Sequence, residues 1–347
     1  MSINIISAHE IFYVLDQEFL SKKWSGSDSL LSRQMKLSQD ILAIFAVKKS
    51  DGKHILFLQC TPEDVTKGNK YPAWKGISID FTGFDNVGME GNYVRIEQNE
   101  ESDDEVYFAV VDDLCSCLLG IERSHLRKEL SSALERWSRF FSFRGSIKLS
   151  QEEQIGLYGE LWMIRSMLQN DIGMQTIGFW KGPYQNVFDF SLQNMGVEIK
   201  TTASKMPYKV YISNEVQLSD RLAGGTLVLG FIAVQPNDSS GETLRDVIKS
   251  IEEYINKDEA VYGLFRDKIF GSGLGNPYID SYTTKYIVKE YAFFNVQEGF
   301  PRILSEDMPI GLGDISYSLD IGACFDYKMD ELQFWQIVKH HAKEATA

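Results

Sequence analysis

The chain has few of the residues that build disulfide frameworks, zinc sites and histidine catalysis. It contains four cysteines and five histidines among 347 residues. Cys115 and Cys117 lack the spacing of a zinc knuckle, and no second pair of cysteines or histidines completes a site. Reduced thiols that pack in the core are the simplest account, so the sequence argues against a zinc-based or histidine-based mechanism.

Long apolar stretches and an N-terminal leader pattern are also missing. No segment reaches the roughly 18 to 20 consecutive apolar residues that a membrane-spanning helix needs. The first residues are polar and mixed, without a basic run before an apolar stretch. We therefore expect a cytoplasmic protein that does not engage a membrane.

Positive charge is in short supply, because 35 lysines and arginines face 49 acidic residues and give a net charge of −14. This balance argues against a protein that coats DNA without specificity. The deficit is uneven, however, since residues 122–148 carry seven basic and three acidic residues. We predict a basic helix in this segment. Arg136 and Arg139 are its candidates for contacting nucleic acid, and solvated surface charge is the alternative.

Periodicity divides the chain into a strand-rich first part and a mixed second part. Alternating patterns predict strands at 41–47, 54–60, 76–81, 92–98 and 106–111. Helical patterns follow, and strands return around residues 189–202 and 226–234. We expect an α+β protein with an N-terminal, mainly antiparallel β domain over 1–112, a helical connector over 113–147, and a last domain over 148–347. That domain should hold a mixed central sheet flanked by helices, with a C-terminal β/α extension.

The most informative segment runs from Asp189 to Lys200. Asp189 precedes a short turn around Asn194, and Glu198 and Lys200 follow in a strand-like stretch. Successive side chains of a strand point to opposite faces, so Glu198 and Lys200 should share one face while Ile199 enters the core. If Asp189 and Glu198 lie on adjacent antiparallel strands, their carboxylates can share one divalent cation.

This set of side chains suits phosphodiester hydrolysis. Mg²⁺ prefers hard oxygen ligands and is commonly held by one or two carboxylates plus the phosphate of a substrate. Lys200 would lie beside the attacking water, where it would orient the water or offset charge that develops on the phosphate. We expect Mg²⁺ as the cofactor, with Mn²⁺ as a substitute. Unrelated charges on a solvated strand face are the alternative interpretation.

A capped helix upstream supplies another acid. Ser150 and Glu153 form a capping box, and apolar residues then recur at helical spacing. Gly156 and Gly159 each cost about 1 kcal/mol in a helix interior relative to alanine, and close approach of another backbone would explain them. We interpret Glu160, at the edge of the apolar stripe, as an acid aimed into the cleft. An ordinary edge charge is the alternative.

The triplet Asp189, Glu198 and Lys200 resembles the active site of the PD-(D/E)xK nuclease superfamily, which consists of Asp followed by Glu, any residue and Lys. The proline that usually precedes the aspartate is replaced by Phe188. The resemblance implies a restriction-endonuclease-like core in which the triplet is catalytic and its two acids hold the metal. It also implies a role for Glu160, because many of these nucleases have a helix glutamate that contacts the metal.

The wider context resembles a family of PD-(D/E)xK proteins encoded among bacterial phage-defence genes, through Gly156 to Trp162 and Ile212 to Leu218. Gln217 falls where members place a polar residue after the catalytic strand. Lys205 and Lys209 also follow that strand and are candidates for contacting nucleic-acid phosphates, although a solvated loop explains each lysine equally well.

We therefore predict a Mg²⁺-dependent endonuclease that hydrolyses DNA in bacterial restriction or phage defence, with DNA and other defence-system proteins as partners. The alternative is a non-catalytic or partner-dependent subunit of a defence complex that binds DNA or protein. The acidic balance favours the alternative, and the intact acidic and lysine positions favour catalysis. The sequence leaves the oligomeric state open, with a homodimer as one option.

Overall fold

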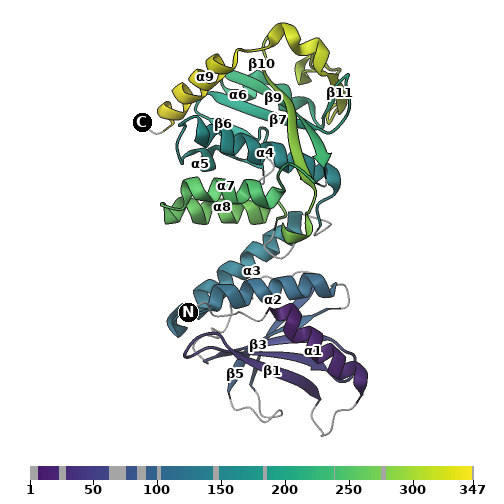
Figure 1. The fold of residues 1–347 in the computed structure, drawn as a ribbon, viewed down its shortest axis with the longest axis vertical. Coiled ribbons are helices and arrows are strands. Elements are labelled where there is room, and N and C mark those ends of the chain that lie inside the picture. Colours follow the sequence, from purple (N-terminus) through teal and green to yellow (C-terminus); the bar gives the residue numbers. More distant parts are fainter. Residues whose placement is uncertain are drawn as a thin grey trace. The chain divides into compact units, whose positions relative to one another are not determined.

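A computed structural model describes residues 7–22, 29–61, 76–83, 91–99, 103–143, 148–182, 186–237, 239–274 and 279–345. The chain divides into two compact units, Met1–Ile147 with Gly275–Pro277 and Lys148–Leu274 with Tyr278–Ala347. Each unit combines helices with a sheet (Figure 1), so the predicted α+β class is confirmed. The finer division at residues 112 and 147 stays a prediction.

The first unit is built on an antiparallel sheet of five strands in the order β1-β2-β3-β5-β4. The helices α1 (Ala8–Ser21) and α2 (Asp104–Leu118) pack against each other, and α1 also packs against β1 and β2. The mainly antiparallel character predicted for this part is confirmed. The strands are β1 (Leu30–Lys36), β2 (Leu42–Lys48), β3 (His54–Cys60), β4 (Ile77–Gly83) and β5 (Asn92–Gln98).

The strand predicted at 106–111 is wrong, because these residues lie inside α2. The helix begins after Asp103, whose carboxylate accepts a hydrogen bond from the N–H of Glu105. Ten of its 15 residues are buried, so its sequence is apolar on nearly every side. A continuous apolar run has no periodicity that separates a buried strand from a buried helix. The basic segment forms the helix α3 (Leu126–Phe143), as predicted.

The second unit contains a mixed sheet of four strands in the order β10-β9-β7-β6. Its strands are β6 (Phe190–Leu192), β7 (Met195–Thr202), β9 (Thr226–Asn237) and β10 (Lys285–Asn295). β7 runs parallel to β9, whereas β6 and β10 run antiparallel to their neighbours. The predicted mixed central sheet is confirmed.

Helices and short strands cover this sheet. The helix α4 (Gln151–Gln169) packs on β7, and α7 (Leu244–Ile255) packs against α4 with α8 (Glu259–Gly271) beside it (Figure 1). The helix α9 (Glu331–Glu344) lies against β10, where the Phe334 ring stacks on Phe293 at 3.7 Å.

One core cluster of the second unit joins β9 to a short ribbon. The ribbon consists of β8 (Lys209–Ile212) and β11 (Tyr317–Asp320), which pair antiparallel. Their inward side chains share a buried cluster with β9 and with the 3-10 helices η3 (Glu215–Leu218) and η6 (Ile321–Tyr327). Among the helices in the ranges given above, none is both long and apolar enough to cross a membrane.

Candidate functional site

The hairpin of β6 and β7 positions the predicted acidic pair. Leu192 pairs with Met195, so two residues form the turn, and Asn194 has a φ of 54° in the left-handed region that asparagine tolerates. Phe190 pairs with Val197, which sets Asp189 opposite Glu198. The predicted antiparallel arrangement of the two acids is confirmed.

Asp189 directly precedes β6, and its side chain continues the hydrogen bonding to β7. The N–H of Ile199 donates to Asp189 Oδ2 at 2.7 Å, so a carboxylate satisfies a backbone group that would otherwise need a strand carbonyl. The backbone N–H of Asp189 in turn donates to the Glu198 carboxylate. Phe188, the residue in place of the usual proline, is buried against Gly196, where an added Cβ would lie 2.7 Å from its ring.

Glu198 and Lys200 share one face of β7, as predicted. Lys200 Nζ lies 2.8 Å from Glu198 Oε1, and the Glu198 side chain is only 2% exposed. Lys200 Nζ also donates to Gln217 Oε1 at 3.0 Å, and the same oxygen accepts from the N–H of Ser213 at 3.1 Å. Two acceptors therefore fix the ammonium group, and Gln217 belongs to the site.

Glu160 reaches this group from α4. Its Oε2 accepts a hydrogen bond from Trp180 Nε1 at 2.7 Å, and the charges of Asp189, Glu198 and Lys200 act on its pKa. The helix comes close to β7, because a Cβ added at Gly159 would lie 1.8 Å from Thr201 Oγ1. That close neighbour is a side chain and not the predicted backbone. Within the described residues, nothing lies within 4 Å of a Cβ added at Gly156, so the predicted close approach there is wrong.

We call Glu160, Asp189, Glu198 and Lys200 the carboxylate cluster. Burial, and then repulsion from Asp189, raises the pKa of Glu160 well above its usual range and that of Glu198 to about 8. Burial also raises the pKa of Asp189. Burial acts to lower the pKa of Lys200, but attraction to Glu198 and then Asp189 outweighs it and raises that pKa. One ammonium group thus faces three carboxyl groups, of which Glu198 is buried and Glu160 and Asp189 are half-buried.

The donor atoms suit a hard divalent cation, although they are not gathered around one point. Within the described residues, no three Asp, Glu, His or Cys side chains are arranged as a complete metal site. Glu160 and Asp189 each spend one oxygen on an N–H donor, and their second oxygens, Oε1 and Oδ1, have no donor in the described part of the chain. Carboxylate oxygens are the ligands that Mg²⁺ prefers, and a cation would supply the charge that Lys200 alone does not.

The predicted nucleic-acid contacts fall in different places. Lys205 and Lys209 are exposed, and Lys209 faces Asp320 across the β8–β11 ribbon. Arg136 lies in the first unit and donates to the buried Asp113 at 3.2 Å, so it has an internal ion pair. The side chain of Arg139 lies outside the described residues. Nucleic-acid contact at these positions stays a prediction.

Sequence reasoning missed Trp180 and Gly182. Trp180 is fully buried and forms an isolated bridge with Phe190 next to Asp189. A Cβ at Gly182 would lie 2.1 Å from Glu160 Oε2, so the backbone closes against that oxygen. No spacing rule links these residues to Glu160, because the chain between them passes through the short helix α5 (Thr176–Phe179) before it returns.

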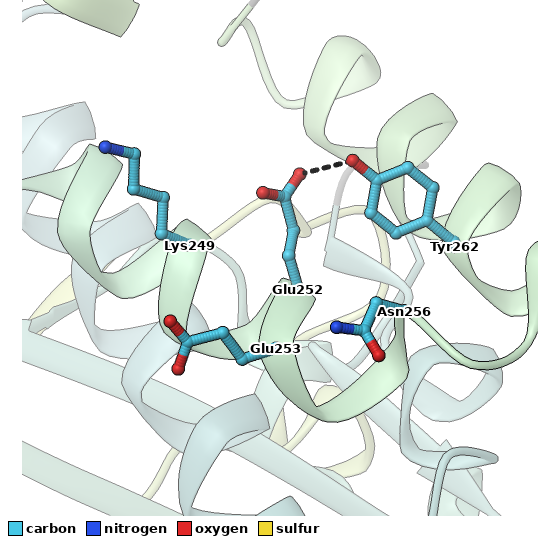
Figure 2. A pocket seen from close by; sticks show the side chains of 5 residues that line it. All are labelled: Lys249, Glu252, Glu253, Asn256 and Tyr262. Carbon is cyan, nitrogen blue, oxygen red and sulfur yellow. Dashed lines mark hydrogen bonds between the residues drawn. The ribbon is translucent and has the colours of Figure 1, made fainter.

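A separate cavity of about 370 Å³ lies on the α7 and α8 side (Figure 2). Glu252 and Tyr262 point toward one another there, and the Tyr262 hydroxyl lies 3.3 Å from Glu252 Oε1. Its lining includes no member of the carboxylate cluster, so the two features are distinct. The cavity is lined by Lys249, Glu252, Glu253, Asn256 and Tyr262.

Comparison with known proteins agrees with this geometry. A family model described as "Putative PD-(D/E)XK family member, (DUF4420)" matches residues 17–322. The match covers most of the chain and includes the entire carboxylate cluster, so the predicted resemblance is confirmed. No curated protein and no solved structure matches the chain.

Proposed function

This chain belongs to the PD-(D/E)XK family whose model it matches, and on that basis we propose that it is a Mg²⁺-dependent nuclease that hydrolyses DNA phosphodiester bonds. The observation that supports the proposal is the carboxylate cluster, in which a strand pair and a helix bring three acids and one lysine together around the buried Glu198. A structural ion pair matches each acid with a base, whereas this cluster sets three acidic groups against one lysine.

Each member of the cluster has a role in this proposal. Asp189 and Glu198 would hold the cation, with Glu160 assisting from α4. A bound Mg²⁺ supplies a Lewis acid for the phosphate and lowers the pKa of its water. Lys200, fixed by Glu198 and Gln217, presents its ammonium group to the attacking water and to the charge that develops on the phosphate.

We further propose that the substrate reaches this site with the help of a partner. A net charge of −14 gives the protein little general attraction for the DNA backbone. A partner protein in bacterial restriction or phage defence would supply that attraction. Such a role would require a cytoplasmic protein. The same charge balance supports the second candidate function, a partner-dependent subunit that binds DNA or protein without cutting.

Cleavage of plasmid DNA in Mg²⁺ or Mn²⁺ tests the nuclease proposal. Glu198→Gln and Lys200→Ala should each lose at least about 100-fold in rate, because each removes charge that acts at the reacting phosphate. Glu253→Gln is the matched control, since Glu253 is exposed on α7 and outside the cluster, and it should cleave like the wild type. Equal cleavage by all four proteins would sink the assignment.

Calorimetry with Mn²⁺ separates the two candidate functions. The nuclease proposal requires metal binding that is lost in Asp189→Asn and in Glu198→Gln. A wild-type protein that binds DNA or a partner but no Mn²⁺ would favour the binding subunit.

A further inference from the structure

The indole of Trp180 holds one oxygen of Glu160. Trp180 is fully buried, and its Nε1–H donates to Glu160 Oε2 at 2.7 Å. This is the single hydrogen bond to the Glu160 carboxylate within the described part of the chain, and it comes from a rigid ring. A side-chain carboxylate can rotate about its last bonds, so one fixed oxygen also sets the direction of the other.

The segment from Trp180 to Gly182 contacts both acids on this side of the cluster. The backbone of Gly182 lies so close to Glu160 Oε2 that a Cβ there would sit 2.1 Å away. The N–H groups of Lys181 and Gly182 donate to the carbonyl oxygen of Asp189 at 2.6 and 3.2 Å. Trp180 thus fixes Glu160 through its side chain, and the next two residues fix Asp189 through their backbone.

A buried ammonium group fixes this segment from behind. Lys268 on α8 is 3% exposed, and its Nζ donates to the carbonyl oxygens of Ile177, at 2.8 Å, and of Trp180. Hydrogen bonds from a charged donor are roughly twice as strong as neutral ones, so the position of the indole is well defined. The buried Lys268 therefore helps to hold Trp180 in place. A tryptophan that only packs in a core does not need such a bond.

We propose that Trp180 is a positioning residue of the metal site, which occupies Oε2 of Glu160 and so presents Oε1 to the divalent cation or to its water. This inference rests on the proposed function, because it needs a metal at the carboxylate cluster. It adds a residue outside the Asp, Glu-x-Lys triplet to the determinants of metal affinity. Hydrogen-bond partners of metal ligands typically change affinity by about 10-fold to 100-fold.

The test is Mn²⁺ calorimetry on the full chain. Trp180→Phe keeps the ring and removes the N–H, and we expect the dissociation constant to rise about 10-fold. Trp162→Phe is the matched control, because Trp162 is a half-buried tryptophan on α4 whose ring packs 5.0 Å from that of Tyr291. It should bind Mn²⁺ like the wild type.

A double-mutant cycle shows whether Trp180 acts through Glu160. In a Glu160→Gln background, Trp180→Phe should have no further effect on Mn²⁺ affinity, because the oxygen it positions no longer serves as a charged ligand. A loss of equal size in both backgrounds would overturn the inference, since a general structural defect gives that result. Unchanged affinity in the single variant Trp180→Phe would overturn it as well.

Gly182→Ala provides a second variant if Trp180→Phe does not fold. It presses a methyl group against the same oxygen, so it should also weaken Mn²⁺ binding, and only when Glu160 is present. The two levels of the hypothesis fail differently. A wild-type protein that binds no Mn²⁺ overturns the proposed function and this inference together. Wild-type binding that neither Trp180→Phe nor Gly182→Ala changes overturns the inference alone.

Discussion

Two groups of ionisable side chains include residues of α4, and the pKa values of their acids are shifted in opposite directions. In the first group, the Glu242 carboxylate accepts hydrogen bonds from both terminal nitrogens of Arg165 at 2.6 Å and from the Tyr158 hydroxyl at 2.8 Å. Burial acts to raise the pKa of Glu242, but the hydrogen bonds from Arg165 and Tyr158 outweigh it and lower that pKa. In the second group, Glu160 belongs to a cluster in which burial raises the pKa of all three carboxyl groups, and repulsion from Asp189 adds to this for Glu160 and Glu198.

The first unit also contains acidic side chains whose charge is balanced by basic or N–H donors, as at Glu242, and we call this arrangement the compensated pattern. Buried Asp113 accepts from Arg136 and from Trp137 Nε1, and Glu97 forms ion pairs with Lys48 and with Arg95. These carboxylates are paired with basic or N–H groups, whereas the carboxylate cluster sets three carboxyl groups against one lysine. This is the difference that we would expect between charge that stabilises a fold and charge at a functional site.

Removing Arg165 should give the largest loss of stability. Arg165→Met leaves the Glu242 carboxylate with a single donor, and the free energy of unfolding should fall by about 2 to 3 kcal/mol. Urea denaturation measures it, with Lys257→Met as the control, because Lys257 is exposed and should change stability by less than about 0.5 kcal/mol. Equal stability of both variants would mean that Glu242 is not held as the contacts indicate.

The two glycines of α4 should respond to alanine with opposite signs. Gly159→Ala places a methyl group against Thr201, so we expect a loss of about 2 kcal/mol in unfolding free energy despite the better helix propensity. Among the described residues, the methyl group of Gly156→Ala meets nothing within 4 Å, so this variant should gain about 1 kcal/mol. Thermal or urea denaturation of the two single variants checks the signs.

A double variant sharpens this comparison. Thr201→Ala removes the closest atom, Oγ1, which is buried and has no hydrogen-bond partner in the part of the chain that the structure describes. It should therefore recover part of the stability lost in Gly159→Ala. If the double variant is as unstable as the sum of its parts, the contact between α4 and β7 does not explain the glycine.

Neutralising one acid of each group should change the free energy of unfolding in opposite directions. Glu198→Gln removes a carboxylate from the side with too many, so the metal-free protein should gain about 1 kcal/mol of unfolding free energy. Glu242→Gln removes the charge that Arg165 requires and should lose about 1 to 2 kcal/mol. Denaturation in the presence of a chelator measures both, and a loss of stability in Glu198→Gln would contradict the excess of charge at the site.

Local sequence patterns predicted the centre of this site well. The Asp189 to Lys200 hairpin depends on a turn residue, a two-residue period and a short connection, all of which lie within twelve positions. The capping box at Ser150 is likewise local, and it forms as predicted. These features can be predicted from the sequence because each depends on residues that are neighbours along the chain.

The remainder depends on contacts that no local pattern encodes. The bonds from Trp180 to Glu160 and from Arg165 to Glu242 join residues 20 and 77 positions apart. The apolar run at 106–111 fits a strand as well as a helix, and packing inside the first unit decides between them. The compensated and uncompensated groups could not be told apart before the fold had placed their partners.

The smallest effect should come from a compensated pair in the first unit. His54 is buried, with Nε2 2.9 Å from Asp16 and Nδ1 2.7 Å from Gln98. Burial acts to lower the pKa of His54, but its bonds to Asp16 and Gln98 outweigh it and raise that pKa. A raised histidine pKa stabilises the fold fully below the unfolded value of about 6.5, and this contribution is lost as pH rises through the folded value.

Asp16→Asn should remove most of this pH dependence. The wild type should be more stable than the variant near pH 6, and the difference should shrink as the pH rises toward 8. Because the Asp16 side chain is 31% exposed, the effect should stay below about 1 kcal/mol. Subtracting the two urea-denaturation curves at each pH cancels the titration of the carboxylate cluster, which both proteins share. A difference that grows with pH would show that His54 is held neutral, and the first unit would then not follow the compensated pattern at this position.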